Sequence, residues 1–313
     1  MRKSGCAKSC DPLHPARVAE LGVLAALFSK YSTGLNDSLS LPAYSANVEP
    51  IPPSNLQTLS IMKLLIIAFA LILQLPAFAK HHAKKPLKAL MITGGCCHDY
   101  KNQKNIISEG ISERVPTKWD IFFEMDQAKS KARLAQKGWA DGFDYVVYNH
   151  CFAKEADASF IKSITDVHKA GKPALALHCA MHSYHWNVKA ENGEKKAWPA
   201  MLGASSRGHG PKAAITVKKV KEHADHPVVK DLPDGWLTPE GELYNVQQVY
   251  EGTTVLAHGD NGKAKEPQAC VWINTHGKGR IFSTTLGHHN STMSTMEYLD
   301  MLGNAVKWIM AKE

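Results

Sequence analysis

The stretch Pro173-Ala-Leu-Ala-Leu-His-Cys-Ala-Met-His-Ser-Tyr-His-Trp186 joins a short apolar run to a sudden cluster of histidines. The turn-forming pair Gly171-Lys172 introduces the run, and an apolar run of this length is typical of a buried strand in a parallel sheet. Within eight residues the chain then presents His178, Cys179, His182 and His185. Because open α/β sheets bind their ligands beyond the carboxyl ends of the strands, this strand end is a candidate active-site edge. The structural alternative is a buried cysteine with helix-capping histidines.

Strands and helices alternate on the N-terminal side of this stretch. Apolar runs predict strands at 87–92, 119–123 and 143–148, and a 3.6-residue period predicts helices at 102–114 and 155–170. This alternation predicts an α/β fold with a doubly wound, mostly parallel sheet. Three of the strands end close to a histidine, namely His98, His150 and His178, so these histidines would share one edge of the sheet. His150 could equally be an ordinary loop residue, and His168 is predicted on the surface of its helix.

The C-terminal third shows a different pattern. Its predicted elements are a short helix at 198–202, a strand at 213–220, an acidic, turn-rich stretch at 242–244, a strand at 253–257, an antiparallel strand pair at 270–274 and 280–285, and a last helix that begins at a capping box, Ser294 to Glu297. The glycines between the two paired strands favour a hairpin turn.

The composition is that of a globular protein with a basic surface. The 313 residues are 44% apolar and 21% charged, with a formal net charge of +8. The Lys and Arg residues are scattered and are not interleaved with aromatic residues, so we expect no nucleic-acid partner. The sequence leaves a homo-oligomer open.

Residues 62–79 have every part of a secretory signal peptide. Met62-Lys63 is a short basic start, residues 64–73 form an apolar core, and Ala77-Phe78-Ala79 is a cleavage site. The apolar core is too short to span a bilayer as a helix, so we expect no stable membrane insertion. We therefore predict a periplasmic or secreted protein that starts at Met62, with residues 1–61 a mis-called or disordered extension, 80–86 a flexible leader and 87–313 a single domain. A real extension followed by a membrane-associated helix is the alternative.

The cysteines after the predicted signal peptide are a poor disulfide framework, because their number is odd: Cys96, Cys97, Cys151, Cys179 and Cys270. Cys96 and Cys97 are adjacent, and a bond between neighbours is strained. None of the spacings matches a structural zinc knuckle.

Seven short motifs, taken in order, resemble the ThuA-like (trehalose-utilisation) family. They are Thr93-Gly94-Gly95 with His98-Asp99, Ala176-Leu177-His178-Cys179-Ala180, Leu202-Gly203 with His209, His226-Pro227, Glu242-Leu243-Tyr244, Trp272 with Gly277-Lys278-Gly279-Arg280, and Thr284-Thr285-Leu286-Gly287-His288. The resemblance covers residues 87–313. It implies a flavodoxin-like fold related to class I glutamine amidotransferases and a link to carbohydrate metabolism.

Mapped onto this chain, the resemblance gives a site in which imidazoles surround one carboxylate. We expect His98, His178, Glu242 and His288 to be catalytic, and the same four to be the ligands if a divalent metal such as zinc is bound. We expect a small carbohydrate to contact His182, Trp186, His209 and Tyr244, with Trp186 and Tyr244 stacking on a sugar ring or, alternatively, only packing. Asp99 could orient His98. No nucleotide cofactor is expected.

Three functions remain open from the sequence. The first is an enzyme of the hydrolase or lyase type that acts on a sugar or an oxidised sugar such as a keto-glycoside. The second is a thiol hydrolase or amidotransferase with Cys179 as nucleophile, although Leu177-His178-Cys179-Ala180-Met181 lacks the glycines of a nucleophile elbow. The third is a carbohydrate-binding protein without catalysis.

Overall fold

A computed structural model of the chain describes residues 85–189 and 196–311, and the predictions made for residues 1–84 lie outside these ranges. The described strands are β1 (Leu87–Gly95), β2 (Thr117–Phe123), β3 (Tyr145–Cys151), β4 (Ala174–Leu177), β5 (Ala204–Lys212), β6 (Thr216–Lys219), β7 (Trp236–Leu237), β8 (Glu242–Val249), β9 (Thr254–Asp260), β10 (Gln268–His276) and β11 (Gly279–Thr284). The helices are α2 (Tyr100–Arg114), α3 (Gln127–Leu134), α4 (Ala158–Lys169), α5 (Ala197–Leu202), α6 (Asn290–Met293) and α7 (Met296–Ile309), with short 3₁₀ turns η1 (His178–His182) and η2 (Lys221–His223).

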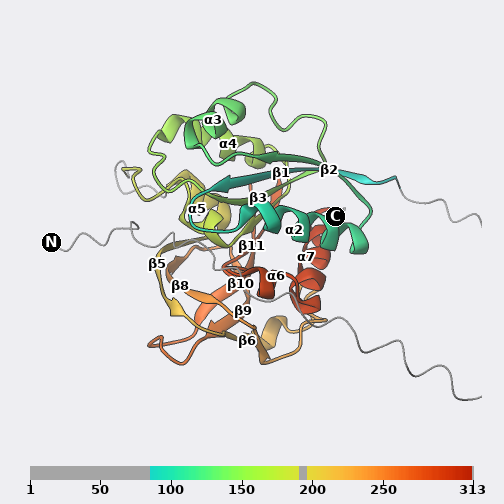
Figure 1. Cartoon of the computed structure of the whole chain (residues 1–313), viewed down its shortest axis with the longest axis vertical. Helices are drawn as coiled ribbons and strands as arrows, with labels where there is room; N and C mark the ends of the chain where they lie inside the picture. Colours follow the sequence, from blue (N-terminus) through green and yellow to red (C-terminus); the bar gives the residue numbers. More distant parts are fainter. Residues whose placement is uncertain (1–84, 190–195, 312–313) are drawn as a thin grey trace, which may run out of the picture. The chain divides into compact units, whose positions relative to one another are not determined.

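Nine of the described strands form one mixed sheet, in the order β2-β1-β3-β4-β11-β10-β9-β6-β7 (Figure 1). Strands β2, β1, β3, β4 and β11 run parallel, and every pairing from β11 to β7 is antiparallel. The predicted antiparallel strand pair is therefore only part of a longer antiparallel half. The reason lies in the connections: residues 204–284, all of them described, contain only the turn η2 as helix. Parallel neighbours need a crossover, whereas tight turns join antiparallel ones.

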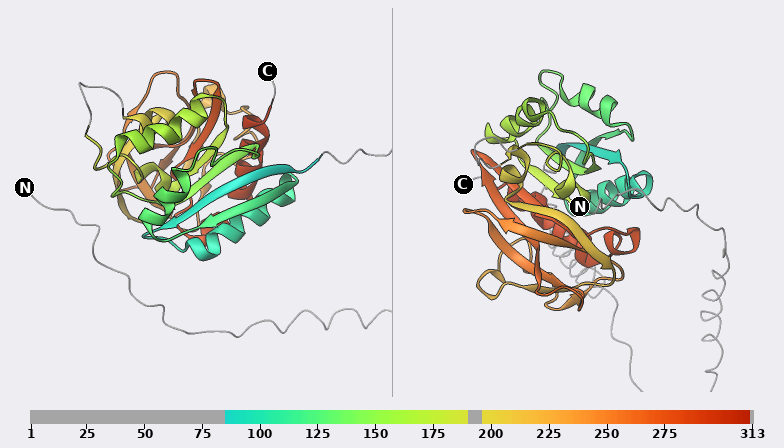
Figure 2. Two further views of the ribbon diagram at one scale, coloured as in Figure 1. Left: turned by 90° about the horizontal axis from the view of Figure 1, so that it is seen from above. Right: turned by 90° about the vertical axis from the view of Figure 1, so that its left-hand side faces the viewer.

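Helices cover both faces of the parallel half (Figures 1 and 2). Successive side chains of a strand point to opposite faces, so Ala89 and Met91 of β1 pack with residues of α2 and α7. Their neighbours Leu90 and Ile92 pack with residues of α3, α4 and α5. Both faces are apolar, which is why β1 and β3 read as continuous apolar runs in the sequence.

Strands β5 and β8 form a separate two-stranded antiparallel sheet. The prediction of a turn-rich stretch at 242–244 was wrong, because Glu242 begins β8. The polar residues and glycines of β5 give no strand signal, and the register between the two strands shifts several times. The pairing partner, not local propensity, makes these segments strands.

Two predicted helix details also change. The last helix begins after Thr295, whose side chain accepts a hydrogen bond from the Tyr298 amide. Ser294, the predicted cap, instead ends helix α6, so the capping box was wrong by one residue. Helix α3 was not predicted, because its exposed, polar sequence carries a weak apolar period.

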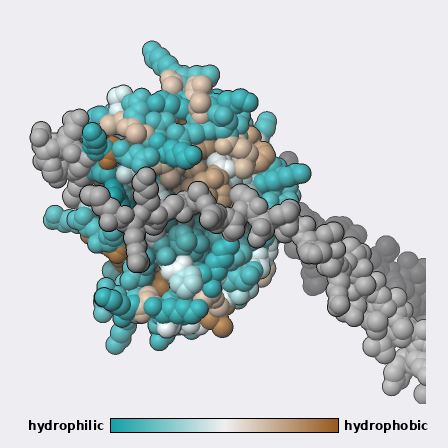
Figure 3. All heavy atoms as spheres, turned by 60° about the vertical axis from the view of Figure 1, so that its left-hand side comes forward, coloured by the Kyte–Doolittle hydropathy of each residue, from teal (hydrophilic) through white to brown (hydrophobic). Residues whose placement is uncertain are grey.

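The described surface is mostly polar. Figure 3 shows hydrophilic side chains over most of the coloured face, with apolar residues in small groups. None of the helices within residues 85–189 and 196–311 has the length and apolar character needed to cross a membrane.

His168 was predicted on the helix surface but is fully buried. Its Nδ1–H donates to the Lys172 carbonyl at 2.7 Å, which leaves Nε2 to accept a hydrogen bond from the Tyr148 hydroxyl at 2.7 Å. These two hydrogen bonds compensate the cost of burying the imidazole ring. The helical period alone could not reveal them, because the partners lie outside the helix. Burial lowers the pKa of His168 to about 4.

We expect the free energy of unfolding to fall as the pH drops from about 6.5 towards 4. In that window the unfolded chain binds a proton on His168 and the folded chain does not, so acid favours unfolding. Each pKa unit corresponds to about 1.4 kcal/mol, so the loss due to His168 is on the order of 3 kcal/mol at pH 4. Urea unfolding at a series of pH values measures it. His168→Gln should be less stable at pH 7 and show a flatter pH dependence, and an unchanged slope would contradict the assignment.

Candidate functional site

Three histidines meet at one edge of the sheet, where parallel strands end. His98 follows β1, His178 follows β4, and His288 follows β11. Their ring centroids lie 4.7–5.3 Å apart. One ring nitrogen from each histidine lies within 4.8 Å of the other two. The structure thus brings together His98 and His178, which the sequence placed at strand ends, and His288, which the family resemblance supplied. His150, the third histidine predicted at this edge, is instead buried within β3, where its Nδ1 lies 3.0 Å from the Ser183 hydroxyl.

Glu242, the first residue of β8, supplies a carboxylate to this cluster. Its oxygens lie 3.6 Å from His178 Nε2, 3.5 Å from His288 Nε2 and 3.1 Å from His209 Nδ1. The side chain is only 7% exposed. Burial would raise the pKa of Glu242, but the hydrogen bond with His178 and the charges that His178, His288 and His209 carry when protonated outweigh burial and lower it. Glu242 is therefore a carboxylate at neutral pH.

The backbone fixes the orientation of His178. Its Nδ1–H donates to the Thr285 carbonyl at 2.6 Å, which directs Nε2 towards the Tyr244 hydroxyl at 3.2 Å and the Glu242 carboxylate at 3.6 Å. A proton or a metal cation between Nε2 and the carboxylate would stabilise this arrangement. Metal-binding histidines commonly donate their second N–H to a backbone carbonyl in this way.

His98 and His288 are neutral at physiological pH. Burial and the charges of His178 and His288 hold the pKa of His98 well below its usual value. Burial and the charge of His178 lower the pKa of His288 to about 3. Among the described residues, no group hydrogen-bonds to the buried Nδ1 atom of either ring. Neutral imidazoles with unused nitrogens are suited to bind a divalent metal.

The residues predicted to contact a sugar surround this cluster. The rings of Tyr244 and His182 are buried and stack on each other at 4.0 Å, so Tyr244 packs with its ring and reaches the site only with its hydroxyl. Trp186 is half-buried, and its Nε1–H donates to the Ser206 carbonyl. His209 is exposed, and its contact with Glu242 connects the site to solvent.

The backbone at the strand end is strained at His178. Its φ of +44° is unusual for a residue with a side chain, and such outliers concentrate at functional sites. Cys179 follows it, is 5% exposed and packs with Tyr100 and Cys151. The turn thus directs an imidazole, not the thiol, towards Glu242.

Sequence reasoning missed several residues that support the site. Buried Gln103 donates to the His288 carbonyl at 3.2 Å and accepts from Asn149 at 3.2 Å. Gln103 lies on α2, and a glutamine within a helix gives no sequence signal for this role. Asp99 does not orient His98: it caps α2 and accepts a hydrogen bond from Asn290. Lys212, opposite Glu242 in the β5–β8 register, adds positive charge that lowers the pKa values of His98 and His288.

Comparisons with known proteins agree with this architecture. Residues 88–309 match the family model described as "ThuA: Trehalose utilisation". A solved ThuA-like structure from Parabacteroides merdae ATCC 43184 is 18% identical, with a TM-score of 0.55 over 72% of this chain and 90% of that one. A second, from Bacteroides uniformis ATCC 8492, is 17% identical, with a TM-score of 0.55 over 74% of this chain and 95% of that one. None of the curated proteins gives a significant match. The family match over most of the chain confirms the resemblance seen in the sequence motifs: the chain belongs to the ThuA (trehalose utilisation) family.

Proposed function

We propose that the chain is an enzyme that acts on a sugar or an oxidised sugar such as a keto-glycoside. The observation that carries the proposal is that the buried Glu242 carboxylate lies within 3.6 Å of ring nitrogens from His178, His209 and His288. Membership of the trehalose-utilisation family supports a role related to carbohydrate metabolism.

The order β2-β1-β3-β4-β11 of the parallel strands is the order of flavodoxin-like sheets, so we also infer the flavodoxin-like, doubly wound fold of class I glutamine amidotransferases.

Glu242 is the proposed general base. A carboxylate that stays ionised and is shielded from water can accept a proton from the carbon beside a sugar ketone. The electrons of the C–H bond then form a C=C bond while the glycosidic C–O bond breaks, and the departing oxygen takes its proton from water. Burial holds the pKa of Tyr244 well above its usual value, so its hydroxyl remains a hydrogen-bond donor that can stabilise the developing enolate oxygen.

The donor set also fits a divalent metal. The residues that would hold it are His98, His178 and His288, because one ring nitrogen of each lies within 4.8 Å of the other two. Glu242, predicted as a fourth ligand, lies 3.6 Å from His178 and 3.5 Å from His288, and its role as general base requires that it stay free of the ion. A zinc-like ion bound there would polarise the sugar carbonyl. We place this chemistry outside the cytoplasm, because the signal peptide predicted at 62–79 would export the protein to the periplasm or beyond.

The test combines metal analysis with turnover. We expect the full chain, loaded with zinc and freed of excess by gel filtration, to retain one zinc and to cleave nitrophenyl keto-glycosides. Without the His288 ring the donor set is incomplete, so His288→Ala should lose the zinc and most of the turnover. His258→Ala is the matched control, since His258 is a half-buried histidine on β9 that pairs with Lys218.

Two other outcomes would replace the proposal. Sugar binding without turnover in any variant would indicate a carbohydrate-binding protein. Turnover that is lost only in Cys179→Ser would indicate a thiol hydrolase. Among the described residues, the burial of Cys179 beside Tyr100 argues against the second outcome.

A further inference from the structure

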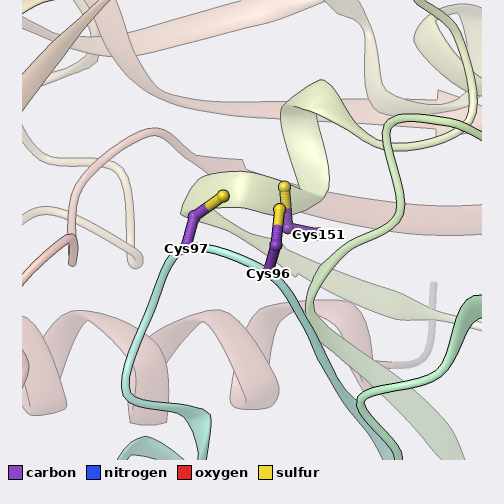
Figure 4. Close-up of side chains that lie close together, drawn as sticks. All are labelled: Cys96, Cys97 and Cys151. Atoms are coloured by element: carbon purple, nitrogen blue, oxygen red, sulfur yellow. The ribbon is translucent and has the colours of Figure 1, made fainter. Parts of the chain in front are cut away.

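Three cysteines, Cys96, Cys97 and Cys151, gather where the loop after β1 meets the end of β3 (Figure 4). The sulfur atoms of Cys96, Cys97 and Cys151 all lie within 4.8 Å of one another. We propose that these three sulfurs form a second metal site, selective for a soft, thiophilic ion with Cu(I) as the best match. We call it the thiol site. It uses none of the residues of the proposed His/Glu site.

The backbone is shaped to bring the three sulfurs together. In the parallel register of β1 and β3, Gly95 lies opposite Cys151. A Cβ on Gly95 would stand 2.2 Å from the Cys151 carbonyl oxygen, so only glycine allows this approach. Cys97 itself has a φ of +85°, a strained value for a residue with a side chain. The strain is located in the residue that completes the sulfur cluster.

The thiol site is open on one side and closed on the other. Cys96 and Cys97 are exposed, whereas Cys151 is buried and packs with Tyr100 and Cys179. An ion can therefore enter from solvent and bind three sulfurs that already lie within 4.8 Å of one another. Little ordering of the chain is needed, which favours binding.

The ligand chemistry selects the class of ion. Thiolates are soft ligands that favour Cu(I), zinc and iron–sulfur clusters, whereas magnesium and calcium require oxygen. Structural zinc sites use four protein ligands. The part of the chain that the structure describes groups no fourth ligand with these three sulfurs, which fits the lower coordination of Cu(I) better. The thiols release their protons to solvent as they bind the ion. Lys154 lies near enough to act electrostatically on Cys96 and to offset part of the remaining negative charge.

The thiol site also has a structural consequence for the His/Glu site. Cys97 directly precedes His98, so an ion held by Cys96, Cys97 and Cys151 would tie the loop that carries His98 to the end of β3. Binding should raise the melting temperature in a ligand-dependent way, because an ion that binds only the folded chain stabilises it.

The test is a competition for Cu(I) under anaerobic conditions. The reduced full chain is titrated into Cu(I) held by the chromophoric chelator bicinchoninate, and we expect it to remove one Cu(I) per chain. Cys96→Ser and Cys97→Ser should each weaken Cu(I) binding roughly 10- to 100-fold. Because both cysteines are exposed, these variants should still fold. Cys270→Ala is the matched control, because Cys270 is a buried thiol on β10 whose Sγ–H donates to the Ala257 carbonyl. It should bind as the unaltered chain does.

The same titration separates this inference from the proposed function. His288→Ala should keep the Cu(I) affinity even though it loses zinc and turnover, and the cysteine variants should keep zinc. The proposal is overturned if the unaltered chain takes no Cu(I) from the chelator, or if the Cys96 and Cys97 variants bind as tightly as the Cys270 control. It is also overturned if thiol counting and mass mapping find a disulfide to Cys151 and the reduced chain still takes up no Cu(I).

Discussion

Replacement of Glu242 by Gln is expected to lower kcat for a keto-glycoside by about 10²–10⁴-fold, the usual contribution of a general base. The amide keeps the size of the side chain and one oxygen acceptor, so the packing around it should survive. It cannot accept a proton, however, and it removes the negative charge that lies between His178, His209 and His288. KM should change much less than kcat, because the lost interaction acts on the transition state.

Glu240→Gln provides the matched control. Glu240 lies two residues away, is exposed, and accepts a hydrogen bond from the Ser291 hydroxyl at 2.7 Å, which an amide oxygen can also accept. The Glu240→Gln variant should turn over the keto-glycoside as fast as the unaltered chain does. Turnover by Glu242→Gln within a few-fold of the unaltered chain, with the same melting temperature, would remove Glu242 from the chemistry.

The parallel half of the fold and part of the site could be predicted because their signals are local. The apolar runs of β1, β3 and β4 mark strands, and in a parallel sheet their carboxyl ends must share an edge. That rule alone places His98 and His178 close together. His288 and Glu242 came from the family resemblance, since nothing in the local pattern assigns Glu242 to a strand.

The remaining features depend on contacts between distant segments. Strand β8 exists because it pairs with β5, and neither has an alternating apolar pattern. The tautomer of His178 depends on the Thr285 carbonyl, more than 100 residues away in the sequence. Cys151 meets Cys96 and Cys97 only through the register of β1 with β3, so no cysteine spacing in the sequence could reveal the thiol site.

The second large effect is expected at Gly95, on which both candidate sites depend. Gly95→Ala should destabilise the fold by about 3 kcal/mol, and lower the melting temperature by roughly 6–12 °C, for two reasons that add. The φ of Gly95 is +90°, where a side chain is strained, and the new Cβ would lie 2.2 Å from the Cys151 carbonyl oxygen. Relief of that clash must push β1 and β3 apart at their ends. Cys96 and His98 would move with the loop, so Cu(I) affinity and turnover should both fall.

Gly142→Ala separates the two causes. Gly142 has a similar φ of +77°, but a Cβ added there meets nothing within 4 Å. It should therefore show only the backbone strain, about 1 kcal/mol, and leave metal binding and turnover intact. Urea unfolding of the two variants measures the difference, which is the cost of separating the two strand ends. If the free energy of unfolding falls equally in both variants, the close approach of Gly95 to Cys151 does not exist in solution. That approach could then explain neither the thiol site nor the position of His98.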